Sequence, residues 1–274
     1  MRKATSIPGE RPLGRPWRKG ACGMIITVTN SKGGVGKTTT AVNLAVALQD
    51  RRKRSLLIDL DPQAHATRCL FQGDPERDVG DLIMEKPSLA HRSVSSTPYP
   101  NLDMVPATRA LTDTAELLSS RIRREERLRK ALEPLRGQYD RIIIDCPPAL
   151  GILTYNAVLA ADLLLIPVQP GVGAVNSLEA LLATAKELRD EEEVPFRILV
   201  TMFDVRTSRT NMIFQDLLAR YRRRILKTII YKSEALNQAN LAGKPVSRFM
   251  RYSRGATAYE NLCDEVLRLR VRTG

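Results

Sequence analysis

Cysteine, histidine and tryptophan are scarce in this chain of 274 residues, which has four, two and one of them. The cysteines are scattered and form no Cys-x-x-Cys pair. Their pattern argues against a structural zinc site or a disulfide framework, and it fits a reducing compartment such as the cytoplasm. Two histidines are too few for a metal site built on imidazole ligands.

Long apolar runs are also missing. None reaches the ~18–20 residues that a membrane-spanning helix needs, and residues 1–23 lack the apolar core of a secretory signal. That segment is rich in Pro, Gly and Arg without periodicity, so we expect a disordered basic N-terminal arm there, followed by one domain over residues 24–274. Whether the arm is translated stays open, because Met24 offers a second start.

Acidic residues are in deficit, since 43 Lys and Arg stand against 30 Asp and Glu, a formal net charge of +13. Residues 1–23 contribute +5 and residues 206–254 contribute +10, which leaves −2 for the rest of the chain. A nearly neutral core with two basic regions favours a polyanionic partner, most simply nucleic acid. The alternative is a solvated basic face that only aids solubility.

One glycine-rich stretch, Ser31–Thr40 (SKGGVGKTTT), carries the clearest signal in the chain. It fits the phosphate-loop pattern Gly-x-x-x-x-Gly-Lys-Ser/Thr, except that serine stands at the first glycine. Three glycines let the backbone curl so that several N–H groups point at one anion. Lys37 would add positive charge near the β- and γ-phosphates, and the Thr38 hydroxyl would ligate Mg²⁺.

Short apolar runs alternate with helical patterns along the chain. The expected strands are 24–29, 55–60, 102–106, 139–146, 162–168 and 197–203. The expected helices are 39–48, 78–84, 112–135, 177–189, 211–222 and 258–270. This alternation predicts an α/β fold with a doubly wound, mostly parallel sheet and helices on both faces. Ligands of such sheets bind at the carboxyl ends of the strands, where the phosphate loop lies.

Aspartates follow two of the expected strands at that same edge. Asp145 ends one strand, where a carboxylate can accept hydrogen bonds from Mg²⁺-bound water. Asp59 and Asp61 flank Leu60, so in an extended chain their side chains share one face. We favour Asp61 for orienting the attacking water or holding the metal, because it lies nearer the loop. Asp59 stays equally open to a role in capping the next helix.

Three segments together resemble the ParA/Soj family of partition ATPases, which belongs to the deviant Walker A group of P-loop NTPases that includes MinD. They are SKGGVGKTTTAVNLA at 31–45, DLDPQ at 59–63 and IIDCPP at 143–148. FMRYSRGATAYE at 249–260 is similar to a late segment of such proteins. The resemblance runs from about Met24 to the C-terminus. It implies an ATPase that converts ATP to ADP and phosphate, with ATP and Mg²⁺ as cofactors.

The resemblance also implies roles for individual residues. Lys32 would be the signature lysine that reaches across a dimer interface to the partner's phosphates, and Lys37 and Asp61 would complete the catalytic set. The nucleotide would be held by Lys32, Gly33, Gly34, Val35, Gly36, Lys37, Thr38, Thr39 and Asp145. The metal would lie near Thr38, Asp61 and Asp145.

The family's mode of action implies a switch. An ATP-bound homodimer would bind DNA non-specifically, and hydrolysis stimulated by a ParB-like partner would release it, so that a chromosome, plasmid or other cargo is segregated. We therefore expect a cytoplasmic, nucleoid-associated protein with no membrane partner. Phosphate contacts need charge rather than base-reading geometry. The candidate DNA contacts are Arg222, Arg223, Arg224, Arg248, Arg251 and Arg254. Arg206 and Arg209 follow the strand 197–203, and we expect them near the nucleotide base.

Two alternatives stay open. A MinD-like membrane-positioning ATPase would need an amphipathic C-terminal helix that is free to bind lipid. In the expected helix 258–270, however, Leu262, Val266 and Leu269 share one face, which suits docking on the domain. A nucleotide-gated DNA-binding regulator would need its own reading element, and no helix-turn-helix pattern precedes the phosphate loop.

Overall fold

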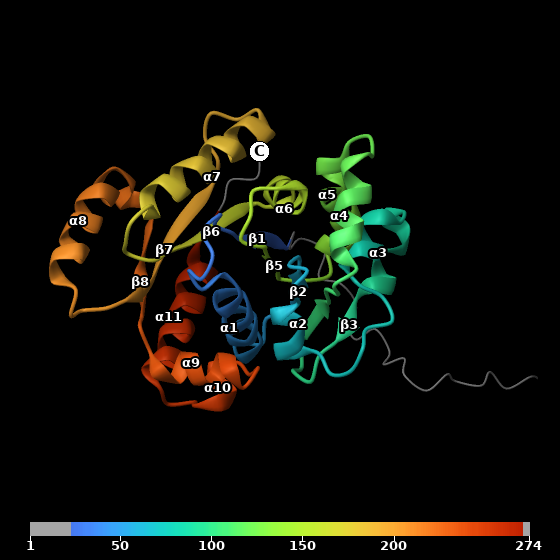
Figure 1. Ribbon diagram of the computed structural model, residues 1–274. Coiled ribbons are helices and arrows are strands. Elements are labelled where there is room, and N and C mark those ends of the chain that lie inside the picture. Colours follow the sequence, from blue (N-terminus) through green and yellow to red (C-terminus); the bar gives the residue numbers. More distant parts are fainter. Residues whose placement is uncertain (1–22, 271–274) are drawn as a thin grey trace, which may run out of the picture.

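The computed structural model describes residues 23–270 (Figure 1), so the arm expected at 1–23 lies outside the described residues except for Gly23. The strands are β1 (Met24–Val28), β2 (Ser55–Asp59), β3 (Ser95–Ser96), β4 (Leu102–Val105), β5 (Arg141–Asp145), β6 (Leu163–Val168), β7 (Phe196–Phe203) and β8 (Ile225–Tyr231). They form one sheet in the order β3-β4-β2-β5-β1-β6-β7-β8. Every neighbouring pair is parallel except β3 with β4. The expected fold class is confirmed.

Helices connect the strands and cover both faces of the sheet. The α-helices are α1 (Lys37–Asp50), α2 (His65–Leu70), α3 (Val79–Met84), α4 (Leu111–Ser119), α5 (Arg127–Arg136), α6 (Ile152–Ala160), α7 (Ala174–Arg189), α8 (Ser208–Leu218), α9 (Glu234–Leu241), α10 (Val246–Phe249) and α11 (Arg254–Arg268). The 3₁₀ segments are η1 (Pro87–Ser93), η2 (Arg124–Glu126) and η3 (Ala219–Arg224). No helix within residues 23–270 is long and apolar enough to cross a bilayer.

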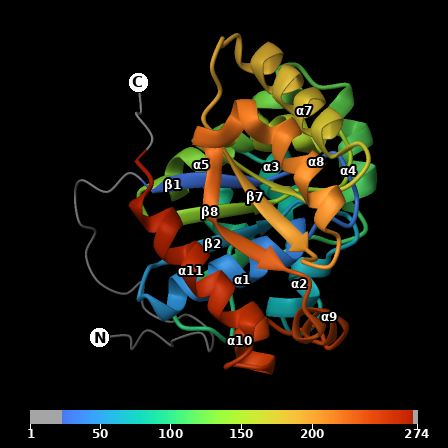
Figure 2. The ribbon, with the colours of Figure 1, turned by 90° about the vertical axis from the view of Figure 1, so that its left-hand side faces the viewer.

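Alternate residues of the central strands enter opposite cores, because successive side chains of a strand point to opposite faces. Ile26 and Leu57 join a core with residues of α1, α9 and α11, whereas Ile25 and Ile58 join one with residues of α3, α4, α5 and α6. Figures 1 and 2 show this layering, with α1 and α11 on one side of the sheet and α4 to α7 on the other. Complete burial of one such side chain stabilises the fold by about 1.5–3 kcal/mol.

The register of the central strands sets up the edge that carries the candidate site. Asp145 at the end of β5 lies opposite Val28 on one side and Asp59 on the other. The loop after β1 begins next to these three residues, directly after Val28. The carboxyl ends of β1, β2 and β5 therefore bring the glycine-rich loop and two aspartates together, as the parallel arrangement predicts.

The prediction of a single helix over 112–135 was wrong. The chain forms α4 and α5 there, with η2 between them. Arg123 has φ of 52°, in the left-handed region that an α-helix does not contain. The helix expected over 211–222 is α-helical only to Leu218, and the following arginines belong to η3. The last helix begins earlier than expected, at Arg254, because the Ser253 hydroxyl caps it by accepting a hydrogen bond from the Ala256 N–H at 3.2 Å.

Candidate active site

The loop between β1 and α1 has the backbone shape that a phosphate cradle requires. Gly34 and Gly36 have φ of 72° and 86°, which glycine adopts without steric cost. A Cβ on Gly34 would meet no atom within 4 Å, so conformation rather than space calls for glycine there. The loop is anchored to β7, because the buried Thr201 hydroxyl donates to the Val35 carbonyl at 2.9 Å.

The N-terminus of α1 adds a positive potential to this cradle. The helix begins at Lys37 without a side-chain cap and without an acidic residue in its first turn. Its first N–H groups are thus left for a ligand, and the helix dipole favours an anion at that position. The Thr38 hydroxyl lies in the same turn, half-buried beside the loop. Backbone donors, dipole and hydroxyl all converge where the phosphates of a nucleotide would bind.

Two lysines of the loop differ in their surroundings. Lys37 is only 6% exposed, and its Nζ donates to the Lys32 carbonyl at 2.9 Å. Burial lowers the pKa of the Lys37 ammonium, and the nearby Asp145 carboxylate raises it. Lys32 is half-buried, and its own Nζ donates to the Val172 carbonyl at 3.2 Å, in the loop before α7. A buried ammonium held by one carbonyl has donors to spare for phosphate oxygens.

Asp145 is the strongest indication that a cation belongs at this site. Its carboxylate is completely buried, and neither oxygen accepts a well-formed hydrogen bond. The Thr38 hydroxyl lies close enough to lower the pKa of the carboxyl, but this does not outweigh burial. Burial, reinforced by the neighbouring Asp59 carboxylate, raises the pKa of Asp145 well above its usual range. A buried, unsatisfied carboxylate is costly unless a ligand completes its contacts.

The donor set suits magnesium bound together with a nucleotide. No cluster of three or more His, Cys, Asp or Glu side chains that could hold a metal occurs among residues 23–270. Mg²⁺ usually keeps several waters and takes one or two protein ligands along with substrate phosphates. The Thr38 hydroxyl and the Asp145 carboxylate fit such a shared site, with Asp61 nearby.

The two aspartates around Leu60 have different surroundings. One Asp59 oxygen accepts hydrogen bonds from the Thr67 N–H and hydroxyl, both at 2.8 Å, and the other accepts from the Asp61 N–H at 3.1 Å. Burial raises the pKa of Asp59 to about 6. Asp61 is 8% exposed, and its Oδ1 accepts from the Gln63 N–H at 2.9 Å. Asp59 thus ties β2 to α2 and holds the segment that carries Asp61.

A cavity of about 290 Å³ opens beside the phosphate loop. Gly36 and Thr39 form its wall on the loop side. The opposite wall comes from the ends of β7 and β8 and from α9: Met202, Asp204, Tyr231, Lys232, Asn237 and Asn240. Since the cavity is continuous with the phosphate cradle, the base and sugar of a nucleotide would occupy it.

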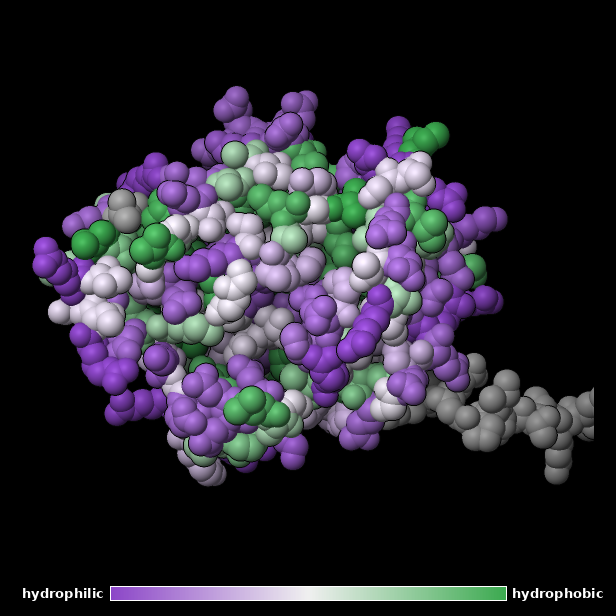
Figure 3. Space-filling view, in the orientation of Figure 1, coloured by the Kyte–Doolittle hydropathy of each residue, from purple (hydrophilic) through white to green (hydrophobic). Residues whose placement is uncertain are grey.

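Sequence reasoning missed most of this cavity. Asn240 donates to the Thr39 hydroxyl at 3.1 Å across 201 residues of sequence, and no local pattern marks it. Arg206, which we expected near the base, binds Asp204 at the rim, and Arg209 does not line the cavity. Hydrophilic side chains cover much of the face shown in Figure 3, and hydrophobic side chains form scattered patches among them.

The six arginines considered for DNA contact are not gathered in one place. Arg222, Arg223 and Arg224 directly precede β8, at the amino edge of the sheet and away from the phosphate loop. Arg224 is also engaged within the chain, since it pairs with Glu193 at 3.4 Å and lies 5.3 Å from the centre of the Phe196 ring.

The other three arginines follow β8 and α9. Arg254 lines a cavity next to the nucleotide cavity, together with Arg206 and Lys232. Arg251 lies over the Tyr252 ring at 5.8 Å. Arg248 pairs with Asp50 at the end of α1, hydrogen-bonds Gln49 and lies over the ring of Tyr99. The structure thus offers two separate basic groups, which we name the amino-edge group (Arg222–Arg224) and the α10–α11 group (Arg248, Arg251 and Arg254).

Comparison with known proteins agrees with this geometry. Residues 23–198 match the family model described as an AAA domain. The chain is 40% identical to the sporulation initiation inhibitor protein Soj of Bacillus subtilis over 249 residues, which cover 89% of this chain and 98% of Soj. It is 37% identical to the chromosome partitioning protein ParA of Myxococcus xanthus over 253 residues, covering 90% of this chain and 88% of ParA.

A solved structure is similar over the same length. Cobyrinic acid a,c-diamide synthase from Mycobacterium smegmatis with bound ADP and magnesium superposes with a TM-score of 0.75 at 30% identity, covering 90% of this chain and 94% of that one. The fold of this chain is therefore similar to one that holds ADP and magnesium in that protein. From the family model, the relatives and the geometry together, this chain belongs to the Soj/ParA family of chromosome-partitioning ATPases.

Proposed function

We propose that this protein binds ATP with Mg²⁺ at the loop of Ser31–Thr38, hydrolyses it slowly, and uses the ATP-bound state to hold non-specific DNA during partition of a chromosome, plasmid or other cargo. The observation that carries the proposal is the buried Asp145 carboxylate without full partners, facing Lys37 and Thr38 of the glycine-rich loop. It is the position at which a bound cation would offset the cost of burial.

The residues of the site divide the work of phosphoryl transfer. The backbone N–H groups of the loop and α1 would bind the phosphates, and Lys37 would exchange its contact with the Lys32 carbonyl for phosphate oxygens. Mg²⁺ would neutralise charge on the phosphates, held by Thr38 and through water by Asp145. Asp61, positioned by its neighbour Asp59, would orient the attacking water.

Lys32 would act across a homodimer. In the single chain the Lys32 ammonium donates a hydrogen bond to the Val172 carbonyl. Because Lys32 is only half-buried, this contact is easily exchanged for another. A lysine delivered by the second subunit would stabilise charge in the transition state as an arginine finger does. ATP between two subunits would then make dimerisation depend on nucleotide, and hydrolysis stimulated by a ParB-like partner would end it.

DNA binding and nucleoid association are proposed from the positive charge of the chain and from its similarity to partitioning proteins. Residues 206–254 carry a formal charge of +10, and two relatives bear the name of chromosome partitioning proteins. The membrane-positioning alternative has less support, because Leu262 and Val266 of α11 are completely buried in the core with α1. An apolar helix face that is already packed cannot also enter lipid.

The experiment is retention of the protein on non-specific duplex DNA with ATP, with ADP or without nucleotide, at two salt concentrations. We expect retention only with ATP, weaker at high salt. Two triple alanine variants, one in the amino-edge group and one in the α10–α11 group, would be compared at equal nucleotide occupancy. Equal retention in all nucleotide states would contradict the proposed switch. Undiminished retention in both variants would remove these arginines from the DNA site.

A further inference from the structure

One residue that lines the nucleotide cavity carries a carboxylate for which the proposed chemistry has no use. Among the residues that line it, Asp204 alone carries a carboxylate, and its side chain is 19% exposed. A carboxylate beside a purine has a strong bearing on which base fits. Guanine presents two donors side by side, its N1–H and its 2-amino group, which match two carboxylate oxygens, whereas adenine presents a donor next to an acceptor.

Arg206 occupies both oxygens of that carboxylate. Its Nε donates to Oδ1 at 2.9 Å and its Nη2 donates to Oδ2 at 2.6 Å, and its backbone N–H adds a third bond to Oδ1 at 3.1 Å. This is the bidentate geometry in which a guanidinium matches a carboxylate. The contact also holds the pKa of Asp204 well below its usual range, so the pair stays ionised at any ordinary pH.

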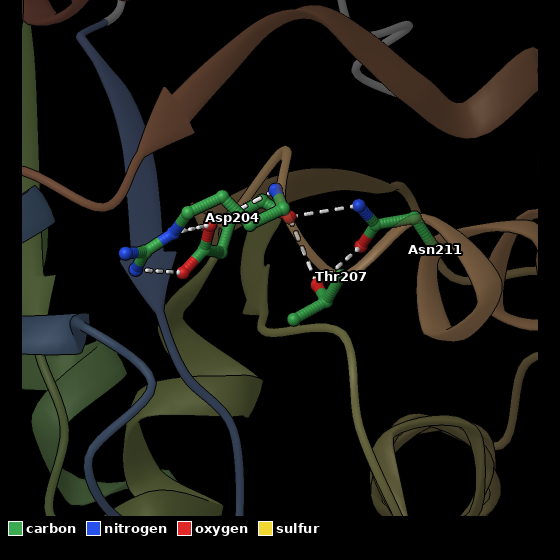
Figure 4. A network of polar contacts seen from close by, with 4 residues as sticks. Asp204, Thr207 and Asn211 are labelled. Carbon is green, nitrogen blue, oxygen red and sulfur yellow. Dashed lines mark hydrogen bonds and ion pairs between the residues drawn. The ribbon is translucent and has the colours of Figure 1, made fainter.

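A second set of contacts fixes the backbone of Asp204 without the help of the ion pair. Figure 4 shows its carboxylate directed to the guanidinium on one side and its carbonyl directed to Thr207 and Asn211 on the other. The carbonyl accepts from the Thr207 hydroxyl and from Asn211 Nδ2, each at 2.9 Å. Asn211 is buried, and the Phe203 carbonyl accepts from the Lys232 N–H at 3.0 Å. Loss of the guanidinium would therefore leave Asp204 in place in the wall of the cavity.

We propose that Arg206 is a specificity-determining residue that makes this cavity select adenine over guanine nucleotides. By engaging both oxygens of Asp204, it withdraws the pair of acceptors that guanine would use and neutralises the charge beside the base. Adenine needs no such acceptor pair. Arg206 acts through Asp204 rather than by touching the nucleotide, so it is a positioning residue for selectivity. The inference rests on the proposed binding of ATP at this site.

The test is the ratio of the dissociation constants for ATP and GTP, each with Mg²⁺, measured by calorimetry on the full chain. Arg206→Ala should bind GTP more tightly and lower the preference for ATP by roughly 5- to 100-fold, the discrimination of one good bidentate pair. Arg206→Met, which keeps the length but removes every donor, should do the same. In Arg206→Ala/Asp204→Asn the gain for GTP should disappear, because an amide offers only one acceptor oxygen.

Arg220→Ala is the matched control, because it breaks an exposed ion pair with Glu179 that lies outside the cavity, and its ratio should equal that of the wild type. An unchanged ratio in both single variants would overturn the inference while leaving ATP binding intact. A double variant that keeps the full gain for GTP would also overturn it. Failure of the wild type to bind either nucleotide would instead contradict the proposed function itself.

Discussion

Replacement of Asp145 by Asn should stabilise the protein in the absence of nucleotide while weakening its function. The Asp145 carboxylate is completely buried, lacks full hydrogen-bond partners and faces the buried Asp59 carboxylate. Lys37 offsets part of this cost, but the pKa of Asp145 is raised on balance, so its surroundings disfavour the charged form. Asn has nearly the same shape and carries no charge, so the variant removes the charge without opening a cavity.

The size of the effect follows from the cost of burying a charged group without partners. The exchange replaces an unsatisfied buried charge with an unsatisfied neutral polar group, which costs less, about 1–3 kcal/mol, so we expect the free energy of unfolding to rise by on the order of 1 kcal/mol at pH 7. For a chain of this size, that is a rise in melting temperature of roughly 2–4 °C.

The sign of the pH dependence is fixed by the raised pKa. A carboxyl whose pKa is higher in the folded state binds its proton more tightly there, so the wild type gains stability from this group as pH falls through the folded-state pKa. The amide side chain of the variant has no proton to gain. The advantage of Asp145→Asn should thus be largest at alkaline pH and shrink as the solution is acidified.

Thermal unfolding from pH 5 to pH 9, with and without Mg²⁺ and ATP, tests this reasoning. Binding to the folded state adds stability in proportion to RT ln(1 + [ligand]/Kd), and the variant should gain less because it lacks the carboxylate that helps to hold the metal. The reasoning is refuted if nucleotide-free Asp145→Asn melts below the wild type at pH 7. It is also refuted if the difference between them does not narrow at acidic pH.

Three further substitutions probe the phosphate loop, the DNA contacts and the docking of α11. Lys37→Met should weaken ATP binding by roughly 10- to 100-fold through loss of a charge-assisted contact and abolish hydrolysis, measured by calorimetry and phosphate release; near-normal affinity would contradict its role. Arg254→Ala should lower the slope of log K against log [salt] for non-specific DNA by about 1, and an unchanged slope would exclude a phosphate contact there. Leu262→Ala, in the core under α11, should lower the free energy of unfolding by about 2–5 kcal/mol in urea titrations, and a loss under 1 kcal/mol would show that the helix docks loosely.

The buried half of the fold could be predicted from the sequence because its signals are local. Strands such as β2 and β6 are covered on both faces, so they appear as unbroken apolar runs. The edge strand β8 was missed for the opposite reason. It exposes Lys227 in its middle and Tyr231 at its end, so no unbroken apolar run marks the whole strand. The break after α4 was missed because a left-handed arginine at 123 leaves no mark in a charged segment.

The candidate site likewise has one half that the sequence marks locally and one half that it does not. The phosphate-binding half lies in one short loop and two strand ends, so motif spacing locates it. The base-binding half joins Thr39 to Asn240, which only the tertiary fold brings together. The basic region was misleading for a related reason. Arg224 and Arg248 are close in sequence, but the seven residues of β8 lie between them. That strand spans about 23 Å, from the amino ends of the parallel strands to their carboxyl ends.

In the proposed switch, ATP controls the association of two copies of this chain. Its most direct test is the molar mass by light scattering with Mg²⁺ and either ATP or ADP, for the wild type and for Asp61→Ala, which should bind ATP without hydrolysing it. We expect a species of twice 30.6 kDa with ATP, longest-lived in Asp61→Ala, and a single chain with ADP. A mass of 30.6 kDa for Asp61→Ala saturated with ATP would contradict it.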